Sequence, residues 1–298
     1  MELYKQKLDA AAKGDRASSL ELLEFIRKEK IRAPDVCVKV GQKLIANGGL
    51  SADNLYTVYE QTLLAALDIN EQDLVDKCIE ALKSKFPDSS RVQRLELMIL
   101  EARGNFSQAD AFYKDMLTKN PSNMLIMKRQ VAIYKAQGKI DDAIAKLNAL
   151  LKNFQTDAGS WIELAELYLA GGNYVKAAFC FEELILTNPL SAFYHERLAE
   201  IYITIGGVDN LKLARKHLAH SIELNDTNNA RALMALIMCT STLASLKLKV
   251  EKEEKDLNKR LHQLAVSKLH TAYNQNATEE VVSIADEVVA ATKESFDD

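Results

Sequence analysis

The feature that most constrains this chain is a sequence pattern that repeats every 34 residues, which is the length of one small structural unit. The segment "WIELAELYLAGGNYVKAAFCFEELILTNP" (161–189) holds two apolar stretches, a Gly-Gly-Asn break and a final proline. Three further sets of residues keep the same register: Gly172 with Gly138 and Gly104, Ala177 with Ala143 and Ala109, and Pro189 with Pro121 and Pro87 (Gln155 interrupts). Such agreement indicates stacked copies of one unit, because a single copy cannot bury its apolar surface alone.

Within one unit, the spacing of apolar residues at steps of three and four predicts two helices. Small alanines let the two helices approach closely, large side chains fill the remaining gaps, and a proline ends the unit. The predicted structural positions are Trp161, Ala165, Tyr168, Ala177, Phe181 and Pro189. This arrangement is typical of the tetratricopeptide repeat, a 34-residue helix-turn-helix unit.

The sequence therefore predicts an all-α fold, a right-handed α-solenoid of tetratricopeptide repeats with helical caps at both ends. Only 15 of the 298 residues are glycine or proline, which also favours helices. We expect one continuous domain with these parts: an N-terminal helical cap at 1–55, repeats at 56–228 (approximately 56–89, 90–123, 124–157, 158–191 and 192–228), and C-terminal capping helices at 229–298.

Two parts of this pattern are irregular. The unit at 56–89 lacks the turn glycine, and the turn "IGGVDNLK" in the unit at 192–228 is expected to be about three residues longer than the others. The charged segment 247–260 is interpreted as a solvated connector or the start of a helix. Two amphipathic helices, at about 257–274 and 278–293, are expected to cover the end of the stack.

The composition excludes several classes of protein. The net charge is −4 and no long basic stripe occurs, so nucleic acid is not an expected partner. The longest uncharged run, Ala232–Leu246, is too short to span a membrane. The first residues lack the apolar core of a signal peptide. We therefore expect a soluble protein of the cytosol or nucleus.

No motif for catalysis or cofactor binding stands out. The four cysteines, Cys37, Cys78, Cys180 and Cys239, are far apart and are interpreted as buried small hydrophobic residues. His217 and His220 share a helix face, but no third metal ligand is near in sequence. Phosphate-loop, nucleophile-elbow and zinc-protease motifs are absent. The sequence predicts no enzyme, no cofactor and no metal.

The inner surface of the stack is the expected binding region, because the first helix of each pair lines it. The usual inner positions of the repeat predict a partner-binding groove of Arg91, Arg94, Lys128, Lys135, Glu166, Phe193, Glu196 and Glu200, with Glu101 and Ile162 at further inner positions. These charges are basic toward the N-terminal half and acidic toward the C-terminal half. An ordinary solvated surface is the plainer interpretation of any one residue, but the segregation of sign favours a docking groove.

One known type of groove is not expected. Tetratricopeptide proteins that hold chaperone C-termini use a lysine and an asparagine one helical turn apart. Lys128 is followed at that spacing by Ala132, and Arg94 by Met98.

Particular words in the sequence narrow the assignment further. They are "YEQTLLAALD" (59–68), "FPDSSRVQRL" (86–95), "KAQGK" (135–139), "WIELAELY" and "KAAFCFEELILTNP". Together with the irregular turn after "IGG", they resemble the family of subunit 2 of the endoplasmic reticulum membrane protein complex, over about residues 36–236.

The resemblance implies a non-catalytic scaffold, peripheral on the cytoplasmic face of the endoplasmic reticulum membrane. The resemblance also implies that this scaffold is part of an insertase, which places transmembrane segments of new proteins, including tail-anchored ones, into the bilayer without nucleotide hydrolysis. The implied partners are the other subunits, namely the cytosolic parts of membrane-embedded subunits and a further soluble subunit. The alternative is a free tetratricopeptide adaptor that binds a peptide segment of a soluble partner.

Overall fold

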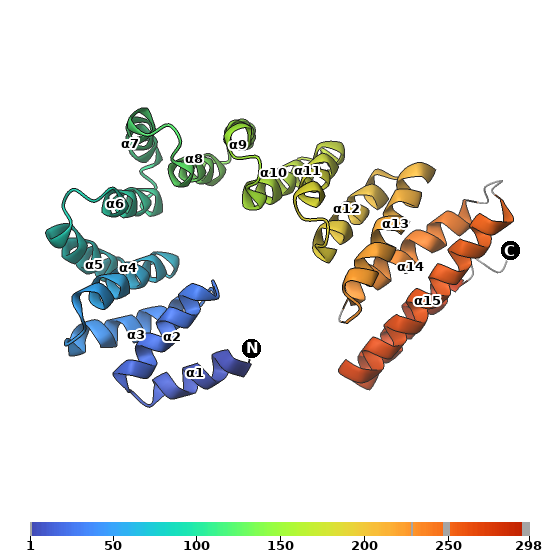
Figure 1. Cartoon of the computed structure of the whole chain (residues 1–298), viewed down its shortest axis with the longest axis horizontal. Helices are drawn as coiled ribbons and strands as arrows, with labels where there is room; N and C mark the ends of the chain where they lie inside the picture. The colour runs from blue at the N-terminus through green and yellow to red at the C-terminus, as the bar shows by residue number, and fades with distance from the viewer. Residues whose placement is uncertain (1, 228, 247–250, 294–298) are drawn as a thin grey trace. The chain divides into compact units, whose positions relative to one another are not determined.

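The computed structural model describes residues 2–227, 229–246 and 251–293. Within these residues the chain forms sixteen α-helices and no β-strand, which confirms the predicted all-α fold (Figure 1). The chain divides into two compact units, Met1–Gly138 and Lys139–Asp298, here called unit 1 and unit 2. The division falls in a turn, between Gly138 and Lys139. The predicted limits of caps and repeats stay a prediction.

Unit 1 contains eight helices that follow one another in chain order (Figure 1). They are α1 (Glu2–Ala12), α2 (Arg16–Lys28), α3 (Pro34–Asn47), α4 (Ala52–Asp68), α5 (Gln72–Lys85), α6 (Ser90–Ala102), α7 (Phe106–Lys119) and α8 (Met124–Ala136).

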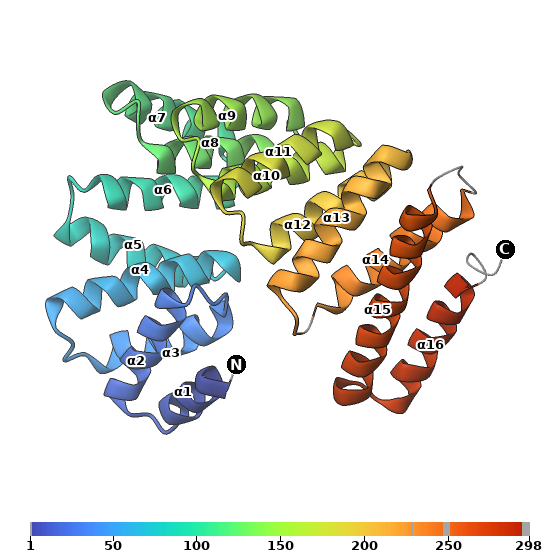
Figure 2. The same ribbon diagram turned by 45° about the vertical axis from the view of Figure 1, so that its right-hand side comes forward.

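Unit 2 contains the other eight helices (Figure 2). They are α9 (Ile140–Asn153), α10 (Ala158–Ala170), α11 (Tyr174–Thr187), α12 (Ala192–Ile205), α13 (Val208–Leu224), α14 (Ala230–Ser245), α15 (Lys252–Asn276) and α16 (Glu279–Lys293).

The repeat register appears directly in where the helices begin. Helices α6, α8, α10 and α12 begin at Ser90, Met124, Ala158 and Ala192, which are equally spaced. Polar residues just before several helices explain these positions, because their side chains accept hydrogen bonds from free backbone N–H groups of the first turn. Asn123 accepts from the N–H of Ile126, and Asp157 accepts from that of Ser160.

The turns between paired helices need a left-handed backbone, which glycine adopts without strain. Gly104, Gly138 and Gly172 have φ angles of 78°, 71° and 70°. The unit without a turn glycine has Asn70 at the equivalent place, one repeat before Gly104, with φ 61°. Asparagine tolerates this conformation better than most residues, so the same turn forms.

The predicted structural positions lie largely in the helix interface. Ala165, Ala177 and Phe181 are fully buried, so α10 and α11 pack closely. Trp161 is half-buried; its indole N–H donates to the carbonyl of Gln155 at 2.8 Å. Tyr168 is half-buried and Pro189 is exposed.

The prediction of a longer turn in the unit at 192–228 is wrong. Only Gly206 and Gly207 separate α12 from α13, and α13 has 17 residues where α11 has 14. Both glycines have positive φ, 75° and 83°, so they reverse the chain in two residues. The three additional residues therefore extend α13.

The N-terminal helices pack as part of unit 1. Pro34 begins α3, where its missing N–H costs nothing. Gly41 of α3 faces Thr62 of α4 so closely that a Cβ at Gly41 would lie 2.0 Å from the Thr62 hydroxyl oxygen. The buried residues of α2 and α4, such as Leu22 and Leu63, belong to one apolar cluster.

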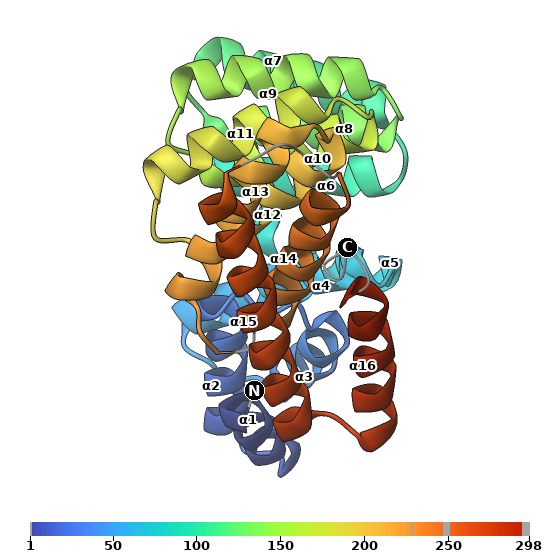
Figure 3. The same ribbon diagram turned by 90° about the vertical axis from the view of Figure 1, so that its right-hand side faces the viewer.

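The C-terminal helices complete unit 2. Helix α15 begins at Lys252, a few residues before the predicted start, and runs antiparallel to α16 (Figure 3). The buried guanidinium of Arg215 on α13 donates to Asn258 and Glu254 of α15, at 3.0 and 2.6 Å. The Asn258 amide in turn donates to the carbonyl of Thr240 on α14. This polar network joins α13, α14 and α15.

No helix in the described part of the chain combines the length and the apolarity that a membrane span requires.

Candidate functional site

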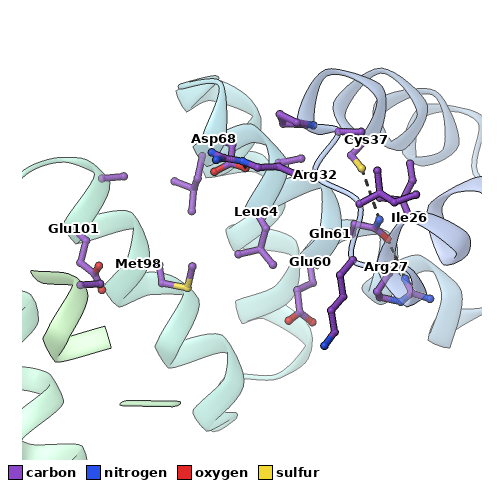
Figure 4. A pocket seen from close by; sticks show the side chains of 18 of the residues that line it. Ile26, Arg27, Arg32, Cys37, Glu60, Gln61, Leu64, Asp68, Met98 and Glu101 are labelled. Carbon is purple, nitrogen blue, oxygen red and sulfur yellow. Dashed lines mark hydrogen bonds and ion pairs between the residues drawn. The ribbon is translucent and has the colours of Figure 1, made fainter. Parts of the chain in front are cut away.

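A groove of about 910 Å³ lies in unit 1 and is here called the unit 1 groove (Figure 4). The first helices of successive pairs, α2, α4, α6 and α8, supply most of its lining, together with the segment 30–37. Its apolar side chains include Leu64 of α4 and Met98 of α6, and Leu64 is 36% exposed. The arrangement agrees with the expected role of first helices in a tetratricopeptide stack.

Three ion pairs cross this groove or its rim. Arg91 of α6 bonds Glu60 of α4 at 2.7 Å, and Arg32 bonds Asp68 at 3.4 Å. Arg129 of α8 makes a two-pronged contact with Glu101 of α6. Each pair joins two different helices or a loop and a helix. Each carboxylate among these lining residues therefore has an arginine as its partner.

The Glu101–Arg129 pair is part of a buried network. The hydroxyl of Tyr113 on α7 donates to Glu101 at 2.5 Å, and both Tyr113 and Glu101 are buried. Burial, together with the neighbouring Glu101 carboxylate, raises the pKa of Tyr113, so this side chain stays protonated and remains a donor. The network thus connects α6, α7 and α8.

The α2 end of the groove is different. Arg27 of α2 donates to the amide oxygen of Gln61 at 3.0 Å, not to a carboxylate. The Gln61 amide donates to the carbonyl of Leu23 and contacts the Cys37 sulfur at 3.7 Å. Lys30 makes no ion pair with any described residue. Two cations thus face this end of the groove without an acidic partner.

The sequence-predicted residues of unit 1 are distributed unevenly around the groove. Arg91 lines it, whereas Arg94 lines a separate hollow of unit 1, of about 370 Å³, beside Asn123 and Leu125. Lys128 is half-buried and Lys135 is exposed, but neither is among the lining residues of the unit 1 groove. Helix α8 presents Arg129, Ala132 and Ala136 to it.

The predicted acidic residues of unit 2 lie on α10 and α12, where arginines pair with them. Arg197 bonds Glu166 at 2.7 Å and Glu200 at 2.9 Å. Arg231 of α14 bonds Glu200 at 2.5 Å and Glu196 at 3.3 Å. These pairs reduce the acidic character that the sequence suggested for this half. Burial, followed by repulsion from Glu200, raises the pKa of Glu196.

A second hollow, of about 490 Å³, lies beside these charges in unit 2. Glu200 and Arg231 form its polar edge, and Ile203, Met234, Met238 and Tyr273 supply apolar surface. Met238 is 56% exposed. Phe193, also predicted to face the groove, is half-exposed on α12 and its ring lies against Tyr194, not in this hollow.

Sequence reasoning predicted Arg91 but missed three other arginines that form ion pairs with acidic residues on these helices: Arg129, Arg197 and Arg231. Arg197 and Arg231 are one repeat length apart, and Arg129 precedes Arg197 by two repeat lengths. The repeat register was therefore a usable signal. The usual inner positions of the repeat did not include these arginines; Arg129 and Arg197 each follow a predicted inner position, Lys128 or Glu196, by one residue.

Histidines gather in unit 2 but do not form a metal site. His195 and His217 bond through their Nδ1 atoms at 2.9 Å, and the His195 ring packs edge-on against His220. Among the described residues, no group of three histidine, cysteine or acidic side chains has the geometry to hold a metal.

The cysteines are all buried and unpaired by disulfides. Burial raises the pKa of Cys78 and Cys239 to about 11 and that of Cys180 to about 12. Burial also raises the pKa of Cys37. Since the thiolate is the reactive form, these side chains are poor nucleophiles at neutral pH.

The helix pairs, their constant register and their groove-lining first helices define a tetratricopeptide-repeat protein. A solved structure of the C-terminal part of a TPR repeat-containing protein from Cytophaga hutchinsonii has the same fold, with a TM-score of 0.53 and 18% identity over 89% of this chain and 98% of that chain. Residues 74–208 match the model of the EMC2 TPR-like repeat domain.

Two relatives are similar over longer stretches. ER membrane protein complex subunit 2-A of Xenopus laevis is 39% identical over 248 residues, which cover 83% of each chain. ER membrane protein complex subunit 2 of Dictyostelium discoideum is 36% identical over 208 residues, covering 69% of this chain and 65% of that protein. The chain belongs to the ER membrane protein complex subunit 2 family.

Proposed function

We propose that this chain is a non-catalytic scaffold subunit of the endoplasmic reticulum membrane protein complex, peripheral on the cytoplasmic face of the membrane. Its role is to brace the cytosolic parts of membrane-embedded subunits while the complex inserts transmembrane segments of new proteins, tail-anchored ones included. The observation that carries the proposal is the 39% identity to a named subunit 2 over 83% of the chain.

The two inner surfaces support a role in binding other proteins. The unit 1 groove and the hollow of unit 2 both combine exposed apolar side chains with charged groups that are already ordered by ion pairs. Ordered side chains lose less conformational entropy when a partner docks. The proposal also keeps the predicted docking residues. Arg91 lies in the unit 1 groove and Glu200 in the hollow of unit 2, whereas the other predicted residues lie outside these two hollows: Arg94, Lys128, Lys135, Glu166, Phe193 and Glu196.

Fractionation of cells tests the proposal. The chain is expected to sediment with endoplasmic reticulum membranes, to be digested by protease added outside sealed vesicles, and to be released by alkaline carbonate. Carbonate breaks protein contacts but does not extract a membrane-spanning helix. After mild detergent, the chain should migrate in a large complex together with membrane-embedded proteins.

Two results would contradict the proposal. Elution of the native chain as a small soluble protein would indicate a free adaptor. Protection from the outside protease would place it on the wrong face of the membrane. Losing the membrane-embedded partners should leave the chain soluble and short-lived, because surface that it normally buries is then exposed.

A further inference from the structure

The unit 1 groove carries an unbalanced charge at one end. Glu60, Asp68 and Glu101 are each held by an arginine of the groove. Arg27 and Lys30 therefore contribute two positive charges that no acidic lining residue neutralises. Since a groove recognises segments whose charge complements its own, a docked segment is expected to bring carboxylates to this end.

Lys30 has a second unusual property. Its φ angle is 54°, in the left-handed region that favours glycine, and it follows the last turn of α2. The N–H of Ile31 bonds back to the carbonyl of Ile26 at 2.9 Å, as in a helix end that glycine commonly completes. A lysine here keeps a cation at the groove at the expense of backbone strain. Strained residues of this kind concentrate at functional sites.

The middle of the groove is apolar. Leu64 and Met98 come from neighbouring first helices and both line the hollow (Figure 4). Methionine adapts its shape to different apolar partners. Apolar surface in the middle and cations at one end match a segment that carries apolar and acidic residues on the same side.

We propose that the unit 1 groove binds an acidic, amphipathic segment of a partner protein, with carboxylates at Arg27 and Lys30. Apolar side chains of the segment pack on Leu64 and Met98. Arg27 and Lys30 lie outside residues 74–208, which match the repeat-domain model, so the N-terminal helices take a direct part in recognition. The inference rests on the proposed scaffold function and names the chemistry of the partner.

The experiment places a photo-reactive benzoylphenylalanine at position 64 of the full chain in cells. Leu64 is partly exposed in the groove, and Leu3 on α1, 53% exposed and outside the groove, is the matched control position. After irradiation, mass spectrometry of the purified complex identifies the crosslinked segment. The expected result is a net-acidic segment that contains apolar residues and is crosslinked from position 64 only.

Three variants sharpen the test. Arg27→Glu combined with Lys30→Glu should lower the crosslink yield and the affinity for a synthetic peptide of the identified segment by about tenfold or more. Lys30→Gly should weaken binding while its melting temperature stays equal or rises, because glycine relieves the backbone. Asn70, with φ 61°, is the other non-glycine residue with positive φ in the described part of the chain. Asn70→Gly gives the same relief without changing the groove charge, so binding should stay unchanged.

A crosslinked segment that is basic or uncharged, a second copy of this chain, or no crosslink from position 64 would overturn the inference. So would a charge-reversed variant with undiminished yield. If the chain co-purifies with membrane-embedded proteins but shows one of these results, only the groove inference fails. If an acidic segment of a soluble protein is crosslinked and the chain is absent from membranes, the proposed scaffold function fails instead.

Discussion

The repeats at 90–123 and 158–191 use equivalent positions in different ways. In the first, Tyr113 is buried and donates to Glu101, which also pairs with Arg129. In the second, the position equivalent to Tyr113 is Phe181, which is fully buried, and the arginine equivalent to Arg129 is Arg197. The Arg197 guanidinium lies 5.9 Å from the centre of the Phe181 ring.

The difference shows what must change when a buried aromatic side chain gains a hydroxyl. A buried hydroxyl is costly unless it is hydrogen-bonded, and Glu101 is the acceptor that makes Tyr113 acceptable. The equivalent of Glu101 is Leu169, because Phe181 needs no acceptor. In both cases the following repeat supplies an equivalent arginine, Arg129 or Arg197. The carboxylate that pairs with it differs: Glu101 is buried, and Glu166 is more exposed.

The largest effect is expected from Glu101→Ala. Removing this carboxylate leaves the Tyr113 hydroxyl and the Arg129 guanidinium without their acceptor, which should lower the free energy of unfolding by about 3 kcal/mol. Urea denaturation followed by circular dichroism measures the change. The double variant Glu101→Leu with Tyr113→Phe copies the residues of the repeat at 158–191. It should lose clearly less, and equal losses would show that the network contributes nothing specific.

A smaller loss, of about 1–3 kcal/mol, is expected from Ala177→Leu, because added methylenes have no room between α10 and α11. Ala109→Leu at the equivalent position should cost less, since a hollow of about 560 Å³ between α6 and α7 gives displaced side chains space. Lys176→Leu, at an exposed neighbour, is the control and should change the melting temperature little. Similar losses for Ala177→Leu and Lys176→Leu would contradict the close packing of Ala177 between α10 and α11.

A pH-dependent effect is expected in unit 2 alone, since unit 1 has no histidine. Burial, followed by the neighbouring His195, lowers the pKa of His217. The unfolded chain therefore binds a proton at a higher pH than the folded chain, and stability contributed by His217 is lost as the pH falls below about 6.5. Thermal unfolding at pH 7.5 and 5.8 should show this loss, and the His217→Gln variant should show less of it. The same pH dependence in both proteins would exclude His217 as its source.

The smallest effect is expected from Glu166→Ala. Arg197 keeps its bond to Glu200 and its contact with the Phe181 ring, so the change in unfolding free energy should stay within about 0.5 kcal/mol. The comparison with Glu101→Ala is direct, because both changes remove a carboxylate from equivalent arginines. A loss from Glu166→Ala as large as that from Glu101→Ala would mean that burial does not explain the difference between the two repeats.

Much of the fold could be predicted because repeats are local. The register that relates Gly172 to Gly104 also places the starts of α6, α8, α10 and α12, since each turn and cap needs a particular residue type at a set distance. The extra length of α13 was assigned to the wrong element, because both a longer turn and a longer helix accommodate three added residues. Two consecutive glycines with positive φ decided between them.

The sequence by itself determined that the chain forms paired helices and which alanines lie between them, because these depend on the spacing of residues along each repeat. It also determined which family the chain resembles, because particular words such as "KAQGK" lie in the sequence itself. Only the tertiary structure decided which charges remain unpaired. Arg197 donates a hydrogen bond to Glu166, and Arg27 donates one to Gln61. In both cases the two partners are about one repeat apart in the sequence. A rotation of one residue on a helix, as between Lys128 and Arg129 on α8, changes which side chain lines the unit 1 groove. Partners of a side chain depend on that rotation and on the approach of neighbouring helices, which spacing alone does not specify.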